Sequence, residues 1–111
     1  RLGGRVKFML SGAAPISPEA IDFLRVAFSC QVYEGYGLTE TCAASCISQP
    51  NDWVSGQVGA PFPCCEVKLV DIPSMGYTSL DKPRPRGEIC IRGRSIFQGY
   101  YKNAEKTAEC L

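Results

Sequence analysis

VKFMLSGAAP, residues 6–15, sets the architecture expected for this chain. The apolar run Val6–Leu10 predicts a short strand, and the small residues and proline of Ser11-Gly12-Ala13-Ala14-Pro15 end it. Helix-start signals follow at once, with Ser17 as N-cap and Pro18 at the first helical position. A strand that turns directly into a helix is the beginning of a β-α-β unit.

The next residues complete that unit. Apolar side chains recur at helical spacing, at Ile21, Leu24, Ala27 and Phe28. Gln31-Val32-Tyr33 predicts the start of a second strand, which we expect to end in the turn-forming run Gly35-Tyr36-Gly37. Two strands joined by one helix imply a parallel pair with a right-handed crossover.

The second half of the chain has a different pattern. Glu66–Val70 and Glu88–Arg92 alternate apolar and polar residues, as half-solvated antiparallel strands do. A proline- and glycine-containing loop is expected over residues 72–86, and Asn103 is expected to cap a helix that begins at Ala104. A break at residues 49–59 separates the two halves. The predicted fold class is therefore α/β.

Composition excludes several classes of protein. A chain of 111 residues makes at most one domain. Its formal net charge of +1 provides no concentrated basic patch, so no nucleic-acid partner is expected. The longest stretch without a charge, residues 53–65, is shorter than the roughly 20 apolar residues of a membrane-spanning helix. Neither end has the polar character of a domain boundary, so the chain is expected to be an internal fragment of a longer protein.

Cysteine usage indicates the compartment. The chain has seven cysteines, an odd number, and no histidine, which excludes mixed Cys/His zinc sites. Cys64 and Cys65 are adjacent, which is awkward for a regular disulfide framework. We therefore expect free thiols in a reducing, intracellular environment.

Residues 34–41, EGYGLTET, carry the sharpest chemical signal. These residues follow the expected carboxyl end of a parallel strand. Open α/β sheets bind their ligands at that end of the strands. Tyr36 offers an aromatic face to a planar base, Thr39 a hydroxyl, and Glu40 an oxygen ligand suited to magnesium on a phosphate. A dinucleotide fingerprint would need glycine where Glu40 stands, so it is rejected. From the residues alone, a simple turn remains the alternative.

A family resemblance supports the interpretation that residues 34–41 bind a ligand. The motifs occur in a fixed order: Ser11-Gly12-Ala13-Ala14-Pro15, Tyr36-Gly37-Leu38-Thr39-Glu40-Thr41, Gly59-x-Pro61, Gly87-Glu88-Ile89-Cys90-Ile91-Arg92-Gly93 and Gly99-Tyr100-Tyr101. This succession resembles the acyl-adenylate-forming (AMP-binding) enzymes. The runs Val32–Gly37 and Glu66–Asp71 look most like eukaryotic long-chain fatty acyl-CoA synthetases.

The resemblance implies a reaction and its cofactors. In that family a fatty carboxylate attacks the α-phosphate of ATP to give an acyl-adenylate, and coenzyme A then displaces AMP. ATP, AMP, Mg²⁺ and coenzyme A are therefore implied, with a long-chain fatty acid as substrate. The parent enzyme is expected to face the cytosol at the endoplasmic reticulum or the peroxisome membrane, although this segment encodes no membrane association.

The resemblance also assigns site residues. It places Tyr36 against the adenine with Gly35 and Glu34 in the same pocket, Thr39 on the α-phosphate and Glu40 on the magnesium. The turn of Gly12, Ala13 and Ala14 would let nucleotide and acyl group lie close together. The cofactor-binding set is Gly12, Ala13, Ala14, Glu34, Gly35, Tyr36, Gly37, Leu38 and Thr39, and the catalytic pair is Thr39 and Glu40. Tyr100 and Tyr101 are expected to pack rather than to bind a ligand, and so is Trp53.

The domain organisation follows. Residues 1–111 are expected to belong to one AMP-binding domain, with the parallel β-α-β part and nucleotide motif in 1–48 and antiparallel strands of a β-barrel-like subdomain in 60–101. Two alternatives stay open: an adenylate-forming ligase for another carboxylate, and a non-catalytic nucleotide-binding or interaction module.

Overall fold

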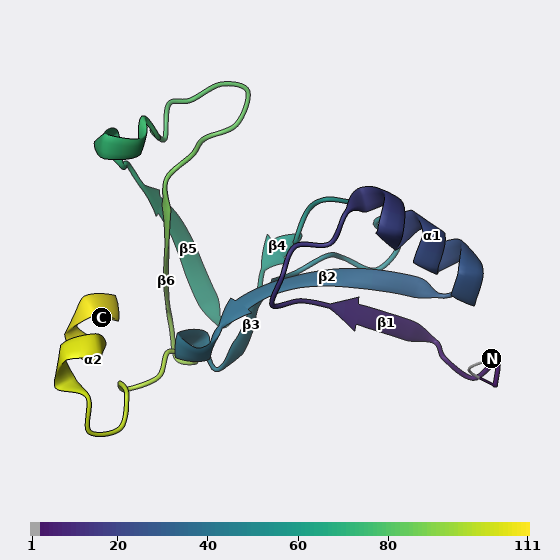
Figure 1. The fold of residues 1–111 in the computed structure, drawn as a ribbon, viewed down its shortest axis with the longest axis horizontal. Coiled ribbons are helices and arrows are strands. Elements are labelled where there is room, and N and C mark those ends of the chain that lie inside the picture. The colour runs from purple at the N-terminus through teal and green to yellow at the C-terminus, as the bar shows by residue number, and fades with distance from the viewer. Residues whose placement is uncertain (1–2) are drawn as a thin grey trace.

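The computed structural model describes residues 3–111, and it begins with the expected β-α-β unit (Figure 1). Strand β1 spans Phe8–Ser11, helix α1 Pro18–Phe28 and strand β2 Gln31–Leu38. β1 and β2 are parallel, with their register running from Phe8 opposite Gln31 to Ser11 opposite Glu34. The predicted parallel pair with its helical crossover is confirmed.

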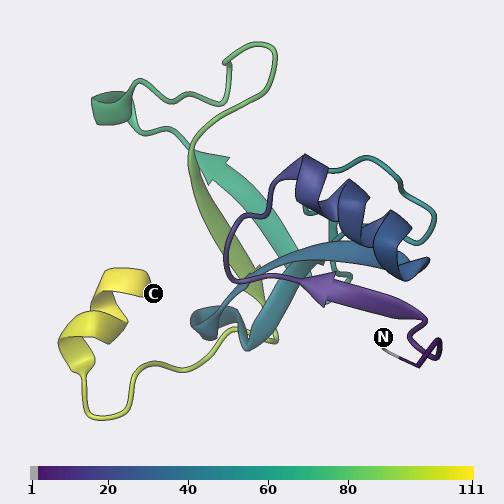
Figure 2. The ribbon, with the colours of Figure 1, turned by 45° about the vertical axis from the view of Figure 1, so that its right-hand side comes forward.

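Local signals account for the ends of α1. The Ser17 hydroxyl accepts a hydrogen bond from the Ala20 N–H at 3.2 Å, as an N-cap does. The helix ends at Ser29, which adopts a left-handed conformation with φ 50°. Ile21 on α1 and Val32 on β2 are buried and mark the small core between the helix and the face of the sheet that it covers (Figures 1 and 2).

β2 is longer than the sequence predicts. The run Gly35-Tyr36-Gly37, expected as a turn, continues the strand to Leu38, with an irregularity between Tyr36 and Gly37. The expectation was wrong because a third strand, β3 (Ala43–Ile47), folds back antiparallel along this part of β2. The two backbones approach so closely at Gly37 that a Cβ there would collide with the Ala43 carbonyl oxygen. A 3₁₀ turn at Thr39–Thr41 joins the two strands.

The completed sheet has four strands in the order β1-β2-β3-β4. The short strand β4 (Ala60–Pro61) pairs antiparallel with β3 and follows the loop of residues 49–59. Antiparallel pairing therefore already begins before this loop, within the segment that the sequence assigned to the parallel half.

The remaining elements extend away from this sheet. Strands β5 (Cys65–Val70) and β6 (Glu88–Gly93) form a separate antiparallel pair, which confirms their expected orientation. The loop between them contains a 3₁₀ turn at Pro73–Met75. Helix α2 (Ala104–Cys110) ends the chain and is capped by Asn103, whose side chain accepts a hydrogen bond from the Lys106 N–H at 3.0 Å.

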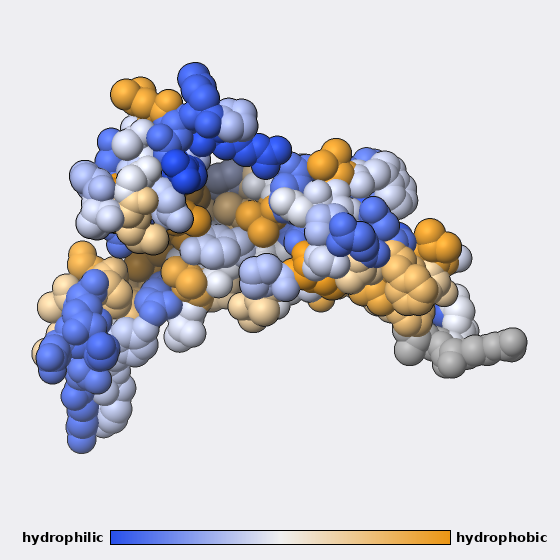
Figure 3. Space-filling model, turned by 45° about the horizontal axis from the view of Figure 1, so that its top comes forward, coloured by the Kyte–Doolittle hydropathy of each residue, from blue (hydrophilic) through white to orange (hydrophobic). Residues whose placement is uncertain are grey.

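The arrangement is open. The radius of gyration is 16.8 Å, whereas a compact domain of this length has about 13 Å. Apolar side chains reach the surface at the end of the molecule that carries β1 and α1, on the right in Figure 3. They include Phe8, Phe23 and Val26, of which Val26 is 81% exposed. Among residues 3–111, neither helix has the length and apolar character that crossing a membrane requires.

The seven cysteines, all within the described residues, form no disulfide in the structure. Cys46 on β3 and Cys65 on β5 are buried. Burial raises the pKa of the Cys46 thiol, with a smaller contribution from Cys65.

Candidate functional site

A cleft of about 600 Å³ opens where β1 ends and along the second half of β2. Eight of the predicted site residues line it: Gly12, Ala13, Gly35, Tyr36, Gly37, Leu38, Thr39 and Glu40. Leu10, Ser11, Ala43 and Ala44 complete the lining. The fold thus brings together two motifs that are more than twenty residues apart in the sequence, at the carboxyl end of β1, the edge where open α/β sheets bind ligands.

The turn after β1 is built from small residues because there is little room for larger ones. A Cβ added to Gly12 would lie only 3.2 Å from the carbonyl oxygen of Gly35 on β2. Ala13 adopts φ 68°, in the left-handed region that larger side chains rarely occupy. The turn therefore packs its backbone close to β2, and the two segments together line the cleft.

The turn at Thr39–Thr41 brings Thr39 and Glu40 to the lining of the cleft. Thr41 holds this turn: its hydroxyl accepts a hydrogen bond from the Leu38 N–H at 2.9 Å and donates to the Ala43 carbonyl oxygen at 2.8 Å. Thr41 is 3% exposed and does not line the cleft. Thr39 is exposed, and its hydroxyl makes no hydrogen bond within residues 3–111, so it is free to donate to a ligand.

Glu40 is fixed by two contacts from a distant segment. The Phe97 N–H donates to the Glu40 carbonyl oxygen at 2.8 Å. The Tyr100 hydroxyl donates to the Glu40 carboxylate. This hydrogen bond lowers the pKa of Glu40 and raises the pKa of Tyr100 to about 12. Glu40 is therefore an ionised carboxylate at neutral pH.

The donor set fits a magnesium ion that arrives with a nucleotide. No group of three or more histidine, cysteine, aspartate or glutamate side chains gathers into a metal site within residues 3–111. Magnesium on a nucleotide usually takes one or two carboxylates, and phosphate oxygens and water supply the other ligands. Glu40, ionised and lining the cleft beside Thr39, fits that requirement.

Two of the predicted site residues, Ala14 and Glu34, do not line the cleft. The Glu34 carboxylate instead accepts a hydrogen bond from the Gly56 N–H at 3.0 Å, and its backbone pairs with Ser48. Glu34 thus holds the loop of residues 49–59. Ala14 lies one residue beyond the cleft lining, in the connection to α1.

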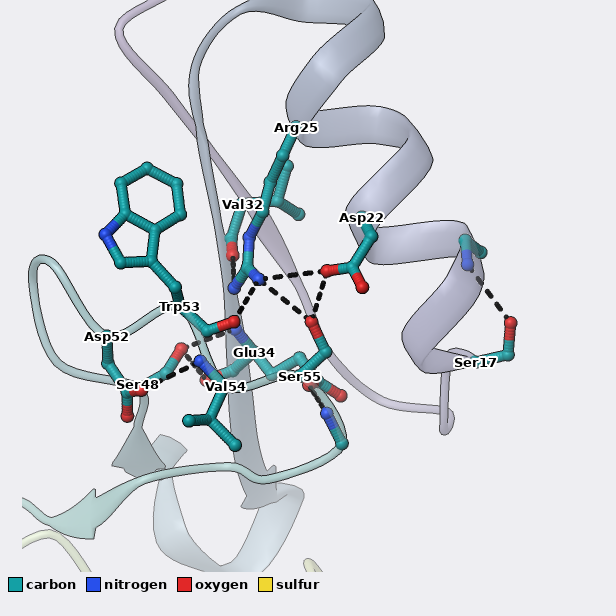
Figure 4. A network of polar contacts seen from close by, with 12 residues as sticks. Ser17, Asp22, Arg25, Val32, Glu34, Ser48, Asp52, Trp53, Val54 and Ser55 are labelled. Carbon is teal, nitrogen blue, oxygen red and sulfur yellow. Dashed lines mark hydrogen bonds and ion pairs between the residues drawn. The ribbon is translucent and has the colours of Figure 1, made fainter.

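Arg25 anchors the same loop from the helix (Figure 4). Its guanidinium donates to the Trp53 carbonyl oxygen at 2.9 Å, to the Ser55 hydroxyl at 2.8 Å and to the Val32 carbonyl oxygen at 3.2 Å. Asp22 completes the network by accepting hydrogen bonds from Arg25 and Ser55. The Trp53 ring lies against Arg25, with 5.7 Å between guanidinium carbon and ring centroid, and does not line the cleft.

Sequence reasoning missed the contacts of Tyr100, Thr41 and Arg25. Tyr100 was expected only to pack, and its ring does meet Phe97 edge to face at 4.9 Å between centroids. Its hydroxyl contact with Glu40 spans 60 residues, which no local pattern signals.

Comparison with known proteins identifies a consistent set of relatives. The family model described as AMP-binding enzyme matches residues 1–101. Long chain acyl-CoA synthetase 7, peroxisomal, of Arabidopsis thaliana is 60% identical over the whole chain. Long chain acyl-CoA synthetase 6, peroxisomal, of the same organism is 57% identical over the whole chain. Human long-chain-fatty-acid–CoA ligase 1 is 51% identical over 110 residues. The chain spans 16% of each Arabidopsis relative and 15% of the human one.

Solved structures agree with this result. The adenylation domain of carboxylic acid reductase from Segniliparus rugosus, determined with AMP and a co-purified carboxylic acid, superimposes with a TM-score of 0.80 at 39% identity. That match covers 97% of this chain and 16% of the reductase chain. A long-chain-fatty-acid–CoA ligase from Archaeoglobus fulgidus superimposes with a TM-score of 0.72 at 28% identity, over 96% of this chain and 22% of that one. The α/β arrangement of strands and helices is therefore that of adenylate-forming domains.

Proposed function

This chain belongs to the AMP-binding enzyme family, and we therefore propose that it forms part of the nucleotide site of a longer enzyme. That enzyme would activate a long-chain fatty acid with ATP and transfer the acyl group to coenzyme A. The observation that carries the proposal is the cleft itself. It brings the Gly12-Ala13 turn and the Gly35–Glu40 segment to one place in a chain of this family.

Each group of the cleft has a role in the proposal. The Tyr36 ring would lie against the adenine, and the backbone of Gly35 and Gly37 would line the same part of the cleft. The Thr39 hydroxyl, which is free of other partners within residues 3–111, would donate to an oxygen of the α-phosphate. Glu40 would hold magnesium, which when bound neutralises phosphate charge as it develops.

The reaction proceeds in two steps. A carboxylate oxygen of the fatty acid attacks the α-phosphorus of ATP and expels pyrophosphate, which leaves an acyl-adenylate. The coenzyme A thiolate then attacks the acyl carbon and expels AMP. The open space above Gly12 and Ala13, beside the phosphate position, would accept the carboxyl end of the acyl group. A donor at Thr39 would stabilise the phosphate oxygens in both steps.

The relatives favour a long-chain acyl substrate. The chain is 60% and 51% identical to two proteins whose names specify a long-chain acyl group. Two of the relatives are named peroxisomal, which favours the peroxisome over the endoplasmic reticulum as the location of the parent enzyme.

The test uses the full-length protein that contains this segment. We expect ATP–pyrophosphate exchange to require a carboxylic acid, and palmitate to support it far better than benzoate or an amino acid. Addition of coenzyme A should then yield palmitoyl-CoA and AMP in equal amounts. Exchange that prefers benzoate or an amino acid would identify a ligase for another carboxylate. A protein that binds AMP but exchanges no pyrophosphate with any acid would be a non-catalytic module.

A further inference from the structure

We propose that Tyr100 is a positioning residue, which holds the Glu40 carboxylate in the orientation that a nucleotide-bound cation needs. The inference rests on the proposed function, because it presumes that Glu40 meets the cation. The inference gives a role to the segment that follows β6. This segment does not itself line the cleft.

Two contacts from this segment fix Glu40 in different ways. The Phe97 N–H binds the backbone carbonyl of Glu40 at 2.8 Å and so sets the position of the turn. The Tyr100 hydroxyl binds one oxygen of the carboxylate, Oε1, and so sets the orientation of the side chain. The two aromatic rings pack edge to face, with an interplanar angle of 85°, which makes them one unit.

Tyr100 is itself held by the start of α2. Its N–H donates to the Thr107 hydroxyl at 2.9 Å, and that hydroxyl donates to the Asn103 carbonyl oxygen at 2.8 Å. Gly99 permits this arrangement: it has φ 134°, and a Cβ there would lie 2.6 Å from the Thr107 methyl carbon. The position of the Tyr100 hydroxyl therefore depends on residues 99–107 rather than on the cleft.

The chemistry of the contact suits a cation ligand. The Tyr100 hydroxyl contacts Oε1 of Glu40, and the backbone N–H of Glu40 makes a weaker contact with the same carboxylate. A carboxylate has lone pairs on both oxygens, so one oxygen can accept from Tyr100 while the other faces a cation. A neutral hydroxyl orients the carboxylate without cancelling its charge, whereas lysine or arginine would form an ion pair and compete with the metal.

The experiment compares Tyr100→Phe with Tyr101→Phe in the full-length protein. Both remove one hydroxyl from neighbouring residues, but the Tyr101 side chain is 87% exposed and its hydroxyl has no partner within residues 3–111. Calorimetry would measure the affinity for α,β-methylene-ATP, once with Mg²⁺ and once with EDTA. The ratio of the two affinities isolates the contribution of the cation. A magnesium titration of ATP–pyrophosphate exchange and a thermal melt would accompany it.

We expect Tyr100→Phe to lower the magnesium enhancement of binding about threefold to tenfold, since a partly exposed hydrogen bond to a charged group contributes modestly. The half-saturating magnesium concentration should rise by a similar factor, with affinity in EDTA and the melting temperature unchanged. Tyr101→Phe should match the wild type.

Glu40→Gln distinguishes a failure of the Tyr100 inference from a failure of the proposed metal role of Glu40. If it abolishes the magnesium enhancement while Tyr100→Phe preserves it, Tyr100 does not position Glu40 and the proposed function stands. If Glu40→Gln keeps the enhancement, Glu40 does not meet the cation, and both the metal assignment and the inference are overturned. A loss of affinity in Tyr100→Phe that is equal with Mg²⁺ and with EDTA would also overturn the inference, because it would indicate a general structural defect.

Discussion

The Glu34 carboxylate accepts a hydrogen bond from the Gly56 N–H at 3.0 Å, which ties the middle of β2 to the loop of residues 49–59. The Ser48 hydroxyl accepts from the Glu34 N–H at 2.8 Å and strengthens the same connection. Glu34 thus comes directly before the cleft residues in the sequence, but its carboxylate binds the loop of residues 49–59. Adjacency in a motif does not establish a shared role.

Glu34 should therefore tolerate loss of charge but not loss of its acceptor. In Glu34→Gln the amide oxygen can still accept from Gly56, so we expect the KM for ATP of the full-length enzyme to change by less than about twofold. In Glu34→Ala the loop loses its anchor, and we expect a loss of about 1 kcal/mol in the free energy of unfolding. Steady-state kinetics and denaturant unfolding measure these effects. A tenfold rise in the KM for ATP in Glu34→Gln would place the charge in the nucleotide pocket instead.

The start of the fold could be predicted because its signals are local. Ser17 and Pro18 mark the first turn of α1. Of the apolar residues at helical spacing, Ile21 is buried, whereas Phe28 is 41% exposed, so the spacing predicted the helix better than its buried face. Asn103 likewise marks the start of α2. Each signal involves residues three or four positions apart, whose backbone hydrogen bonds and contacts form within one element.

Features that depend on distant partners could not be predicted. The glycines at 35 and 37 favour a turn in isolation, but β3 pairs with them and makes them part of a strand. The sequence of β3, AASCI, is short and has only one branched apolar residue to suggest a strand. The contact between Tyr100 and Glu40 depends on how β6 returns past the turn at residues 39–41, which no spacing in the sequence encodes.

Arg25 should protect the loop of residues 49–59 from proteolysis. It carries three hydrogen bonds to Val32, Trp53 and Ser55, and its side chain is 10% exposed. Arg25→Ala would leave the carbonyl oxygens without a donor, so we expect the loop to open and chymotrypsin to cut at Trp53 about tenfold faster or more. The control is Glu19→Ala, which removes an exposed side chain of the same helix that has no part in this network and should change the rate little. Equal cleavage in the wild type and Arg25→Ala would show that the network does not hold the loop.

The loop between β5 and β6 should depend on pH through Asp81. The N–H and hydroxyl of Thr78, with Arg86, lower the pKa of Asp81 below its ordinary value of 3.8. Because the folded pKa is depressed, this contribution to stability is fully present above the unfolded pKa and is lost as the pH falls through the lower folded pKa. We expect the Thr78 amide resonance to titrate with a midpoint below 3.8. In Asp81→Asn that transition should disappear. A midpoint at or above 3.8 would contradict the assignment.

Glu40→Gln tests the metal role directly. The substitution keeps the size and a hydrogen-bonding oxygen but removes the negative charge that magnesium prefers. In the full-length enzyme we expect the adenylation step to slow by roughly 10²-fold or more, equivalent to about 3 kcal/mol of transition-state stabilisation. Thioester formation from ready-made acyl-adenylate involves no departure of pyrophosphate, so it should suffer much less. Raising the magnesium concentration should restore part of the adenylation rate.

Thr39→Ala provides the contrast within the same turn. Its hydroxyl would donate to the α-phosphate, which is present in ATP and in the acyl-adenylate, so both half-reactions should slow, each by roughly 10-fold or more. Added magnesium should not restore either rate, because the missing hydroxyl is a hydrogen-bond donor and not a metal ligand. The two half-reactions would be measured separately across a magnesium titration for both variants. If Glu40→Gln slows both steps equally and magnesium has no effect, this glutamate acts through the structure of the turn and not through the metal.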